Sequence, residues 1–165
     1  MTVIGFDVTP RLRSTVLAGV LALAASAAHA QSAPFAGMAG VWSGGGTISL
    51  EGGATERIRC KATYAVSGDG TGLNQSLTCA SDSYKFDLRS DVTASNGALT
   101  GQWSESRRGV GGTLKGRAGN GQFNVTVTAP AFTANLVMNT KGSKQSVAIT
   151  SEGQFRGANI TLTRS

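Results

Sequence analysis

The stretch that decides the fold is residues 57–79, RIRCKATYAVSGDGTGLNQSLTC. Apolar side chains take every second position on both sides of the central segment Ser67-Gly68-Asp69-Gly70. A period of two is that of a β-strand with one buried face. An Asp-Gly pair tolerates the positive φ angles of a tight turn. The stretch therefore predicts two antiparallel strands joined by a hairpin, with Cys60 and Cys79 facing each other.

The same alternation continues over the rest of the chain after residue 39. Its runs are separated by turn signals such as Ser95-Asn96-Gly97 and Gly119-Asn120-Gly121. Short links predict antiparallel neighbours, and one apolar face per strand predicts a sheet wrapped around a single core. Closing such a sheet removes its exposed edges. We therefore expect an all-β fold, an antiparallel meander of about ten strands that is closed or nearly closed into a small barrel.

Residues 1–30 predict a secretory signal peptide. Two arginines precede the apolar run 16–25, and Ala28-His29-Ala30 then gives the small-x-small pattern before Gln31. This pattern predicts cleavage after Ala30, and an uncleaved N-terminal anchor is the alternative. We expect three regions: the signal at 1–30, an N-terminal arm at 31–39, and one barrel domain at 40–165.

An exported chain of this kind would work in the periplasm or outside the cell, with no transmembrane segment after cleavage. Because those compartments are oxidising, we expect a structural disulfide between Cys60 and Cys79; a redox-active pair is the alternative. Without the two arginines and one aspartate of the signal, the formal net charge falls from +6 to +5. That charge favours an anionic envelope component as a partner. No basic run is interleaved with aromatic residues, so nucleic acid is not expected, and we expect a monomer.

The residue types that remain after cleavage argue against common catalytic sites. The single histidine of the chain, His29, lies inside the predicted signal. Without histidine there is no Ser-His or Cys-His pair, and bonded cysteines supply no thiol. Metal sites lack histidine and free cysteine as ligands. The sequence therefore predicts that the protein is not an enzyme and holds no metal or cofactor.

Binding is the function that the sequence favours. Several polar or aromatic side chains share the inward parity of the apolar positions and form a candidate pocket for a small apolar ligand: Trp42, Tyr64, Gln75, Trp103 and Glu105. In the alternative arrangement, Trp103 fills a solid core and Glu105 reaches solvent at the rim. The alternative function is a surface interaction, through the arm 31–39, the glycines 44–46 or the basic segment 107–109.

Short motifs carry resemblances to known proteins. Gly40-Val41-Trp42, at the start of the first expected strand, and Gly101-Gln102-Trp103 resemble the G-x-W motif of lipocalin-like and avidin-like barrels of the calycin type. That resemblance implies that a tryptophan plugs one end of the barrel. A signal, an arm, a G-x-W strand and one disulfide are also similar to periplasmic inhibitors of metalloproteases. Longer stretches, including 42–48, 56–64, 79–84 and 101–105, resemble uncharacterised exported proteins of alphaproteobacteria, which implies a location and no activity.

Overall fold

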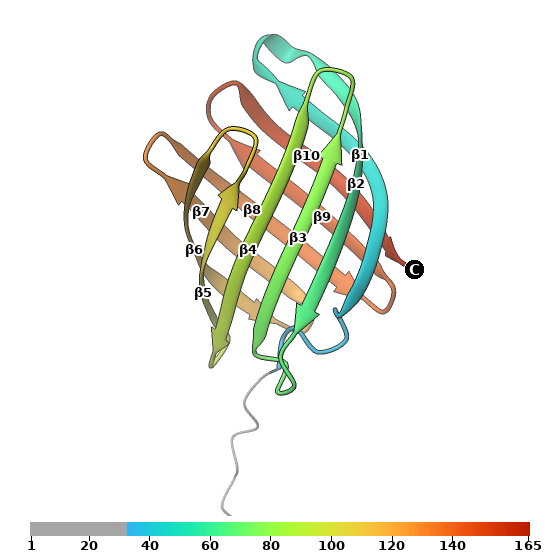
Figure 1. Ribbon diagram of the computed structural model, residues 1–165, viewed down its shortest axis with the longest axis vertical. Helices are drawn as coiled ribbons and strands as arrows, with labels where there is room; N and C mark the ends of the chain where they lie inside the picture. Colours follow the sequence, from blue (N-terminus) through green and yellow to red (C-terminus); the bar gives the residue numbers. More distant parts are fainter. Residues whose placement is uncertain (1–32) are drawn as a thin grey trace, which may run out of the picture.

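The chain folds into a closed barrel of ten antiparallel strands (Figure 1). The structure, a computed structural model, describes residues 33–165; the predicted signal and the first two residues of the arm lie outside the described residues. Each strand pairs with the next one along the chain, and the first pairs with the last. The predicted closed meander is therefore confirmed.

The strands occupy nearly the whole described chain after the arm. A single 3-10 turn, η1 (Glu51–Gly53), interrupts them. No helix in the described part of the chain is long and apolar enough to cross a membrane. The strands are β1 (Gly40–Leu50), β2 (Thr55–Val66), β3 (Gly72–Ala80), β4 (Lys85–Ser95), β5 (Ala98–Glu105), β6 (Val110–Gly119), β7 (Gln122–Ala129), β8 (Phe132–Lys141), β9 (Lys144–Ser151) and β10 (Phe155–Arg164).

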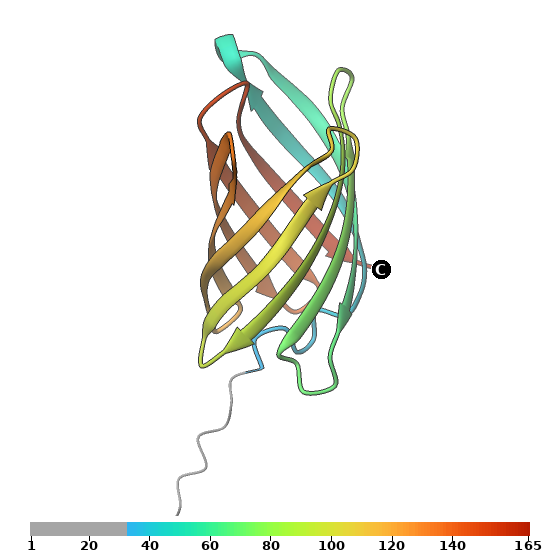
Figure 2. The ribbon, with the colours of Figure 1, turned by 60° about the vertical axis from the view of Figure 1, so that its left-hand side comes forward.

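The barrel has two ends that differ in what covers them. The end drawn at the bottom of Figure 1 carries the β2–β3, β4–β5, β6–β7 and β8–β9 turns together with residues 33–39, and we call it the arm end. The opposite end carries the β1–β2, β3–β4, β5–β6, β7–β8 and β9–β10 connections, and we call it the mouth. The rotated view in Figure 2 shows the same separation of turns between the two ends.

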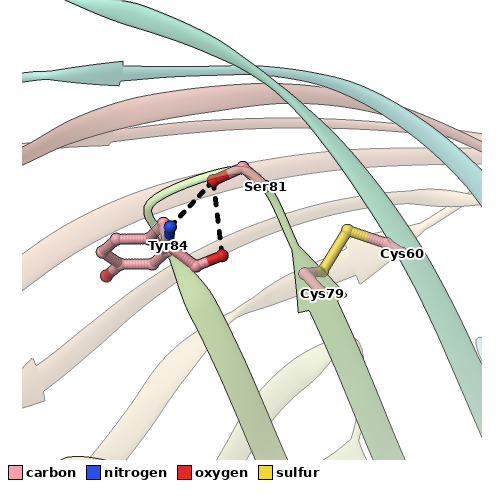
Figure 3. Close-up of a disulfide and its surroundings, with 4 residues drawn as sticks. All are labelled: Cys60, Cys79, Ser81 and Tyr84. Carbon is pink, nitrogen blue, oxygen red and sulfur yellow. Dashed lines mark hydrogen bonds between the residues drawn. A yellow bond between two sulfur atoms is a disulfide. The ribbon is translucent and has the colours of Figure 1, made fainter.

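The hairpin of residues 57–79 forms as the alternation predicts. Cys60 pairs with Cys79 in the β2–β3 register, and a disulfide joins them across a Cα–Cα distance of 4.1 Å (Figure 3). In the turn, the Asp69 carboxylate accepts hydrogen bonds from the Ser67 hydroxyl and from the amide and hydroxyl of Thr71. These bonds hold the pKa of Asp69 down to about 2, because they favour the charged carboxylate.

The glycines at 44–46 lie in the middle of β1 and not in a loop. A Cβ built on Gly46 would lie 1.8 Å from the carbonyl oxygen of Asn159 in β10, and one on Gly112 would lie 1.8 Å from that of Thr128. No side chain fits at such a separation. Glycine at these positions therefore lets neighbouring strands approach where the sheet bends sharply to close the barrel.

The arm closes its end of the barrel. Phe35 and Met38 are each 1% exposed, and the Phe35 ring stacks on Phe123 at 5.8 Å between centroids. The Trp42 Nε1 group donates to the Met38 carbonyl at 2.8 Å. From the last strand, the Arg164 guanidinium lies 5.5 Å from the centroid of the Trp42 ring. Residues 33–39 therefore form a packed plug.

Candidate functional site

Several side chains that face the interior of the barrel are only half-buried. On β7 and β9 the inward residues nearest the arm end, Phe123 and Gln145, are buried, whereas those farther toward the mouth are half-buried. On β8 Ala134 is buried and the other inward residues are half-buried. Solvent can therefore reach side chains that face inward. An eight-stranded barrel is just wide enough for side chains to fill, and ten strands enclose more room. Eight of the half-buried inward apolar residues define what we call the lumen: Leu77, Leu88, Val125, Val127, Leu136, Met138, Val147 and Ile149.

A row of polar and aromatic side chains runs across the wall opposite β7–β9. Tyr64 pairs with Gln75, Gln75 with Ser90, and Ser90 with Trp103 in the registers of β2, β3, β4 and β5. The Ser90 hydroxyl donates to Gln75 Oε1 at 3.0 Å. The buried Trp103 Nε1 group has no hydrogen-bond partner among the described residues. The structure thus brings three predicted pocket residues into one row, which we call the polar row, and adds Ser90.

The Tyr64 end of this row belongs to the closed part of the barrel. The Tyr64 hydroxyl donates to Gln145 Oε1 at 2.8 Å, and Gln145 Nε2 donates to the Thr140 hydroxyl at 3.1 Å. Burial raises the pKa of Tyr64 to about 12, although its hydrogen bond to Gln145 acts in the opposite direction. The ring of Trp42 meets Tyr64 edge to face at 6.1 Å. Tyr64 and Trp42 therefore form the floor of the lumen.

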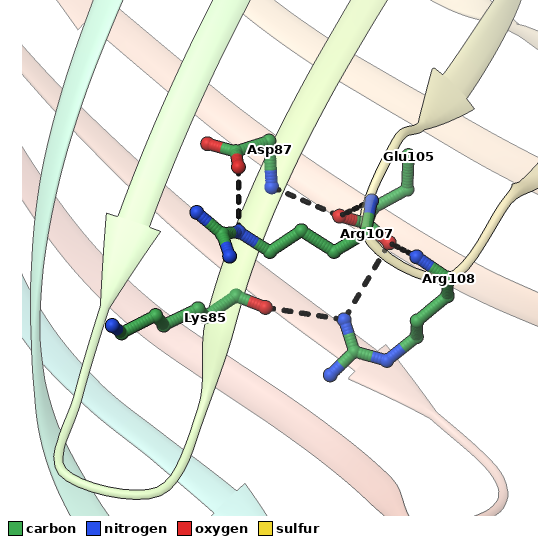
Figure 4. Close-up of polar contacts among 5 residues, drawn as sticks. All are labelled: Lys85, Asp87, Glu105, Arg107 and Arg108. Atoms are coloured by element: carbon green, nitrogen blue, oxygen red, sulfur yellow. Dashed lines mark hydrogen bonds and ion pairs between the residues drawn. The ribbon is translucent and has the colours of Figure 1, made fainter.

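Glu105 lies apart from the other predicted pocket residues, at the mouth (Figure 4). It is 1% exposed, and its carboxylate accepts backbone N–H bonds from Asp87 at 3.0 Å, Arg107 at 3.1 Å and Arg108 at 2.8 Å. Burial acts to raise the pKa of Glu105, but these bonds and the Arg108 charge lower it below the usual value. The carboxylate therefore ties the β5–β6 turn to β4 instead of facing the lumen as a free group.

Aromatic side chains cross part of the mouth. The guanidinium of Arg108 lies 4.3 Å from the centroid of the Tyr84 ring, and this ring stacks on Phe155 at 6.1 Å. Tyr84 directly precedes β4, and Phe155 is the first residue of β10. These two strands are separated by β3, β2 and β1 around the barrel. The Ser81 hydroxyl accepts a hydrogen bond from the Tyr84 N–H and donates one to the Tyr84 carbonyl (Figure 3). Burial raises the pKa of Tyr84, against the lowering effect of Arg108.

Two hollows lie elsewhere on the surface. One, of about 590 Å³, lies along β4–β6, and the other, of about 430 Å³, lies beside the arm. Neither is lined by a lumen residue. Among residues 33–165, no three His, Cys, Asp or Glu side chains come close enough to hold a metal ion; the expectation that the protein holds no metal stays a prediction.

Sequence reasoning missed several residues of this interior. Ser90 interrupts the apolar series of β4 between Leu88 and Val92, and Gln145 precedes Val147 at inward parity. A polar residue at an inward position is a signal for a buried hydrogen bond, so both could have been found. The mouth stack of Tyr84 and Phe155 left no such signal, because the two residues come from distant parts of the chain.

Comparisons with known proteins support the fold. No family model matches the chain, and no curated protein matches it. A solved structure that resembles it is the S-type phycobiliprotein lyase CPES from Guillardia theta, with a TM-score of 0.62 and 8% sequence identity. The match covers 79% of this chain and 90% of that one. At this identity the likeness shows the fold alone, a lipocalin-like barrel, and it gives no support to an alphaproteobacterial family.

The prediction that the protein is not an enzyme is wrong as a conclusion from the sequence. The neighbour just described is by name a lyase on the same kind of barrel. The prediction assumed that catalysis needs histidine or a free thiol, and this assumption covers only some mechanisms. A barrel can also act by holding and orienting a bound molecule.

Proposed function

We propose that this protein takes up a small apolar ligand in the lumen. The observation that carries the proposal is the partial exposure of inward apolar side chains on β7–β9, whose outward neighbours are mostly polar residues. An apolar wall in contact with solvent is unfavourable, and a ligand that covers it gains roughly 2.5 kcal/mol for each 100 Å² of apolar surface removed from water. A lipocalin-like barrel is compatible with this use.

The ligand enters from the mouth. At the arm end, Phe35 and Met38 fill the opening, and Arg164 donates to the Gly37 carbonyl at 2.6 Å over the Trp42 ring. At the mouth, the rings of Tyr84 and Phe155 stack at 6.1 Å between centroids. The alternative function, a surface interaction through the arm, is less favoured. The described part of the arm, residues 33–39, is packed against the barrel and is not a free segment.

We also propose that the chain is exported. The signal pattern at 1–30 supports this, and the disulfide between Cys60 and Cys79 is consistent with an oxidising compartment. The finer resemblance to exported alphaproteobacterial proteins points the same way. N-terminal sequencing of the protein from its native cells tests the proposal: a start at Gln31 supports it, and a start at Met1 contradicts it.

A fluorescence titration tests ligand binding. The probe is N-phenyl-1-naphthylamine, an uncharged apolar dye, and we expect saturable binding with a dissociation constant of about 1–100 μM once association costs are subtracted. Leu136→Trp fills the lumen, whereas Val137→Trp places the same ring on the outer face of the same strand. The inward variant should bind at least about tenfold more weakly, and the outward variant should bind like the wild type.

Two results would contradict the proposal. One is the absence of saturable dye binding by the wild-type protein. The other is equal binding by the Leu136→Trp and Val137→Trp variants, which would place the dye outside the lumen. Far-UV circular dichroism and urea unfolding of both variants show whether each has kept the fold.

A further inference from the structure

The polar row contains a hydrogen-bond donor that the protein itself leaves unused. Trp103 is 8% exposed, and its Nε1 group is the one buried side-chain nitrogen or oxygen without a partner in the described part of the chain. Leaving a buried donor unpaired is unfavourable, so nearly all such groups find a partner. The indole N–H therefore needs an acceptor that the protein does not supply.

The residues paired with Trp103 do not supply this acceptor. On one side, its pair in β6 is Gly112, which offers no side-chain acceptor. On the other side, its pair in β4 is Ser90, whose hydroxyl donates to Gln75 Oε1. Gln75 then keeps its two Nε2 hydrogens for a further acceptor. The ring of Phe132 meets the indole edge to face at 6.1 Å and supplies an apolar wall.

The charges around this site decide what kind of acceptor fits. Within residues 33–165, the lysine and arginine side chains lie at outward positions, in turns or, for Arg164, at the arm end. Arg108 is at the mouth and is engaged with Glu105 and Tyr84. A carboxylate beside Trp103 would therefore be buried without an opposite charge, which is strongly unfavourable. An uncharged oxygen has no such penalty.

We propose that the ligand of the lumen is an uncharged molecule with an apolar body and a carbonyl-type oxygen that accepts a hydrogen bond from Trp103 Nε1. Gln75 Nε2 is the second donor available to that oxygen. The inference rests on the proposed function, since it names the ligand class of the same lumen. It makes Trp103 a binding residue that distinguishes ketones and esters from hydrocarbons and acids.

Three naphthalenes of similar size test this inference by displacing N-phenyl-1-naphthylamine: 2-acetylnaphthalene, 2-ethylnaphthalene and 2-naphthoate. One added hydrogen bond should make the ketone bind about fivefold more tightly than the hydrocarbon. The carboxylate should bind most weakly. In Trp103→Phe the advantage of the ketone over the hydrocarbon should disappear.

Nitrogen-15 NMR of the wild-type protein gives a second readout that needs no variant. The chain has two tryptophans, so two indole N–H resonances are expected. The ketone should shift that of Trp103 downfield, whereas that of Trp42, bonded to the Met38 carbonyl, should not move and is the internal control.

The outcomes separate this inference from the proposed function. Equal affinity for ketone and hydrocarbon, with an unmoved Trp103 resonance, overturns the inference and leaves the lumen as a general apolar site. Tightest binding of 2-naphthoate overturns the assignment of an uncharged ligand. If neither N-phenyl-1-naphthylamine nor any of the three naphthalenes binds, the proposed function is wrong and the inference falls with it.

Discussion

Replacing Glu105 by glutamine should destabilise the barrel at its mouth. The carboxylate accepts three backbone N–H bonds, from Asp87, Arg107 and Arg108, at 2.8–3.1 Å. Glutamine keeps one acceptor oxygen and turns an NH₂ group toward one of these donors. At least one charge-assisted bond is lost and one backbone N–H is left unpaired, so the free energy of unfolding at pH 7 should fall by about 1.5–3 kcal/mol.

The same variant should change the response to acid. The pKa of Glu105 is lowered in the folded protein, so its carboxylate stabilises the fold above the usual value of 4.5 and loses this effect as the pH falls through the folded pKa. Glutamine does not titrate. The difference in unfolding free energy between wild type and Glu105→Gln should therefore be largest near pH 7 and should shrink below about pH 4.5.

Urea unfolding at a series of pH values measures both effects. The matched control is Glu152→Gln, which removes a charge from an exposed turn at the same end of the barrel. It should change the free energy of unfolding by less than about 0.5 kcal/mol. The reasoning is refuted if Glu105→Gln is as stable as this control at pH 7, or if its deficit grows toward acid.

Three further predictions concern the other parts of the barrel. Replacing Cys60 and Cys79 by alanine should lower the free energy of unfolding by about 2–5 kcal/mol, and thiol titration of the unreduced, unfolded wild type should find no free thiol. Because the pKa of Tyr64 is raised to about 12, the neutral Tyr64 hydroxyl adds to the free energy of unfolding below pH 10, and this stabilisation is lost as the pH rises toward 12. Urea unfolding should show the loss in the wild type and not in Tyr64→Phe. Phe35→Ala should lower the free energy of unfolding by about 3–5 kcal/mol in the same assay. A loss of less than about 1 kcal/mol would contradict the role of residues 33–39 as a plug.

Much of the fold could be predicted because its signals are local. The alternation of residues 57–66 and 73–79 around an Asp-Gly turn specifies a hairpin, and the same period over the rest of the chain specifies the meander. The facing of Cys60 and Cys79 follows from that register alone. The arm was not predictable as a plug, because the partner of Phe35 is Phe123, far along the chain.

The candidate site was only partly predictable, for two physical reasons. Parity says which side chains face inward, and it correctly placed Tyr64, Gln75 and Trp103 on that face. It does not say how much solvent reaches them: Val125 and Val147 have the same inward parity as Val92, yet they are half-buried and Val92 is buried. That difference depends on which strands face each other across the closed barrel. Nor does parity show that the turn after Glu105 folds back and donates backbone N–H groups to it.

A methyl NMR titration with N-phenyl-1-naphthylamine tests the central claim, a ligand-binding lumen, most directly. The chain supplies both the test residues and their controls, because Leu136, Val147 and Ile149 face the lumen while Val41 and Val137 lie on the outer surface. We expect saturable shifts of the three lumen methyl groups with one dissociation constant and unmoved resonances from the two outer valines. Shifts confined to Val41 and Val137, or no saturable shift at any of these methyl groups, would contradict the claim.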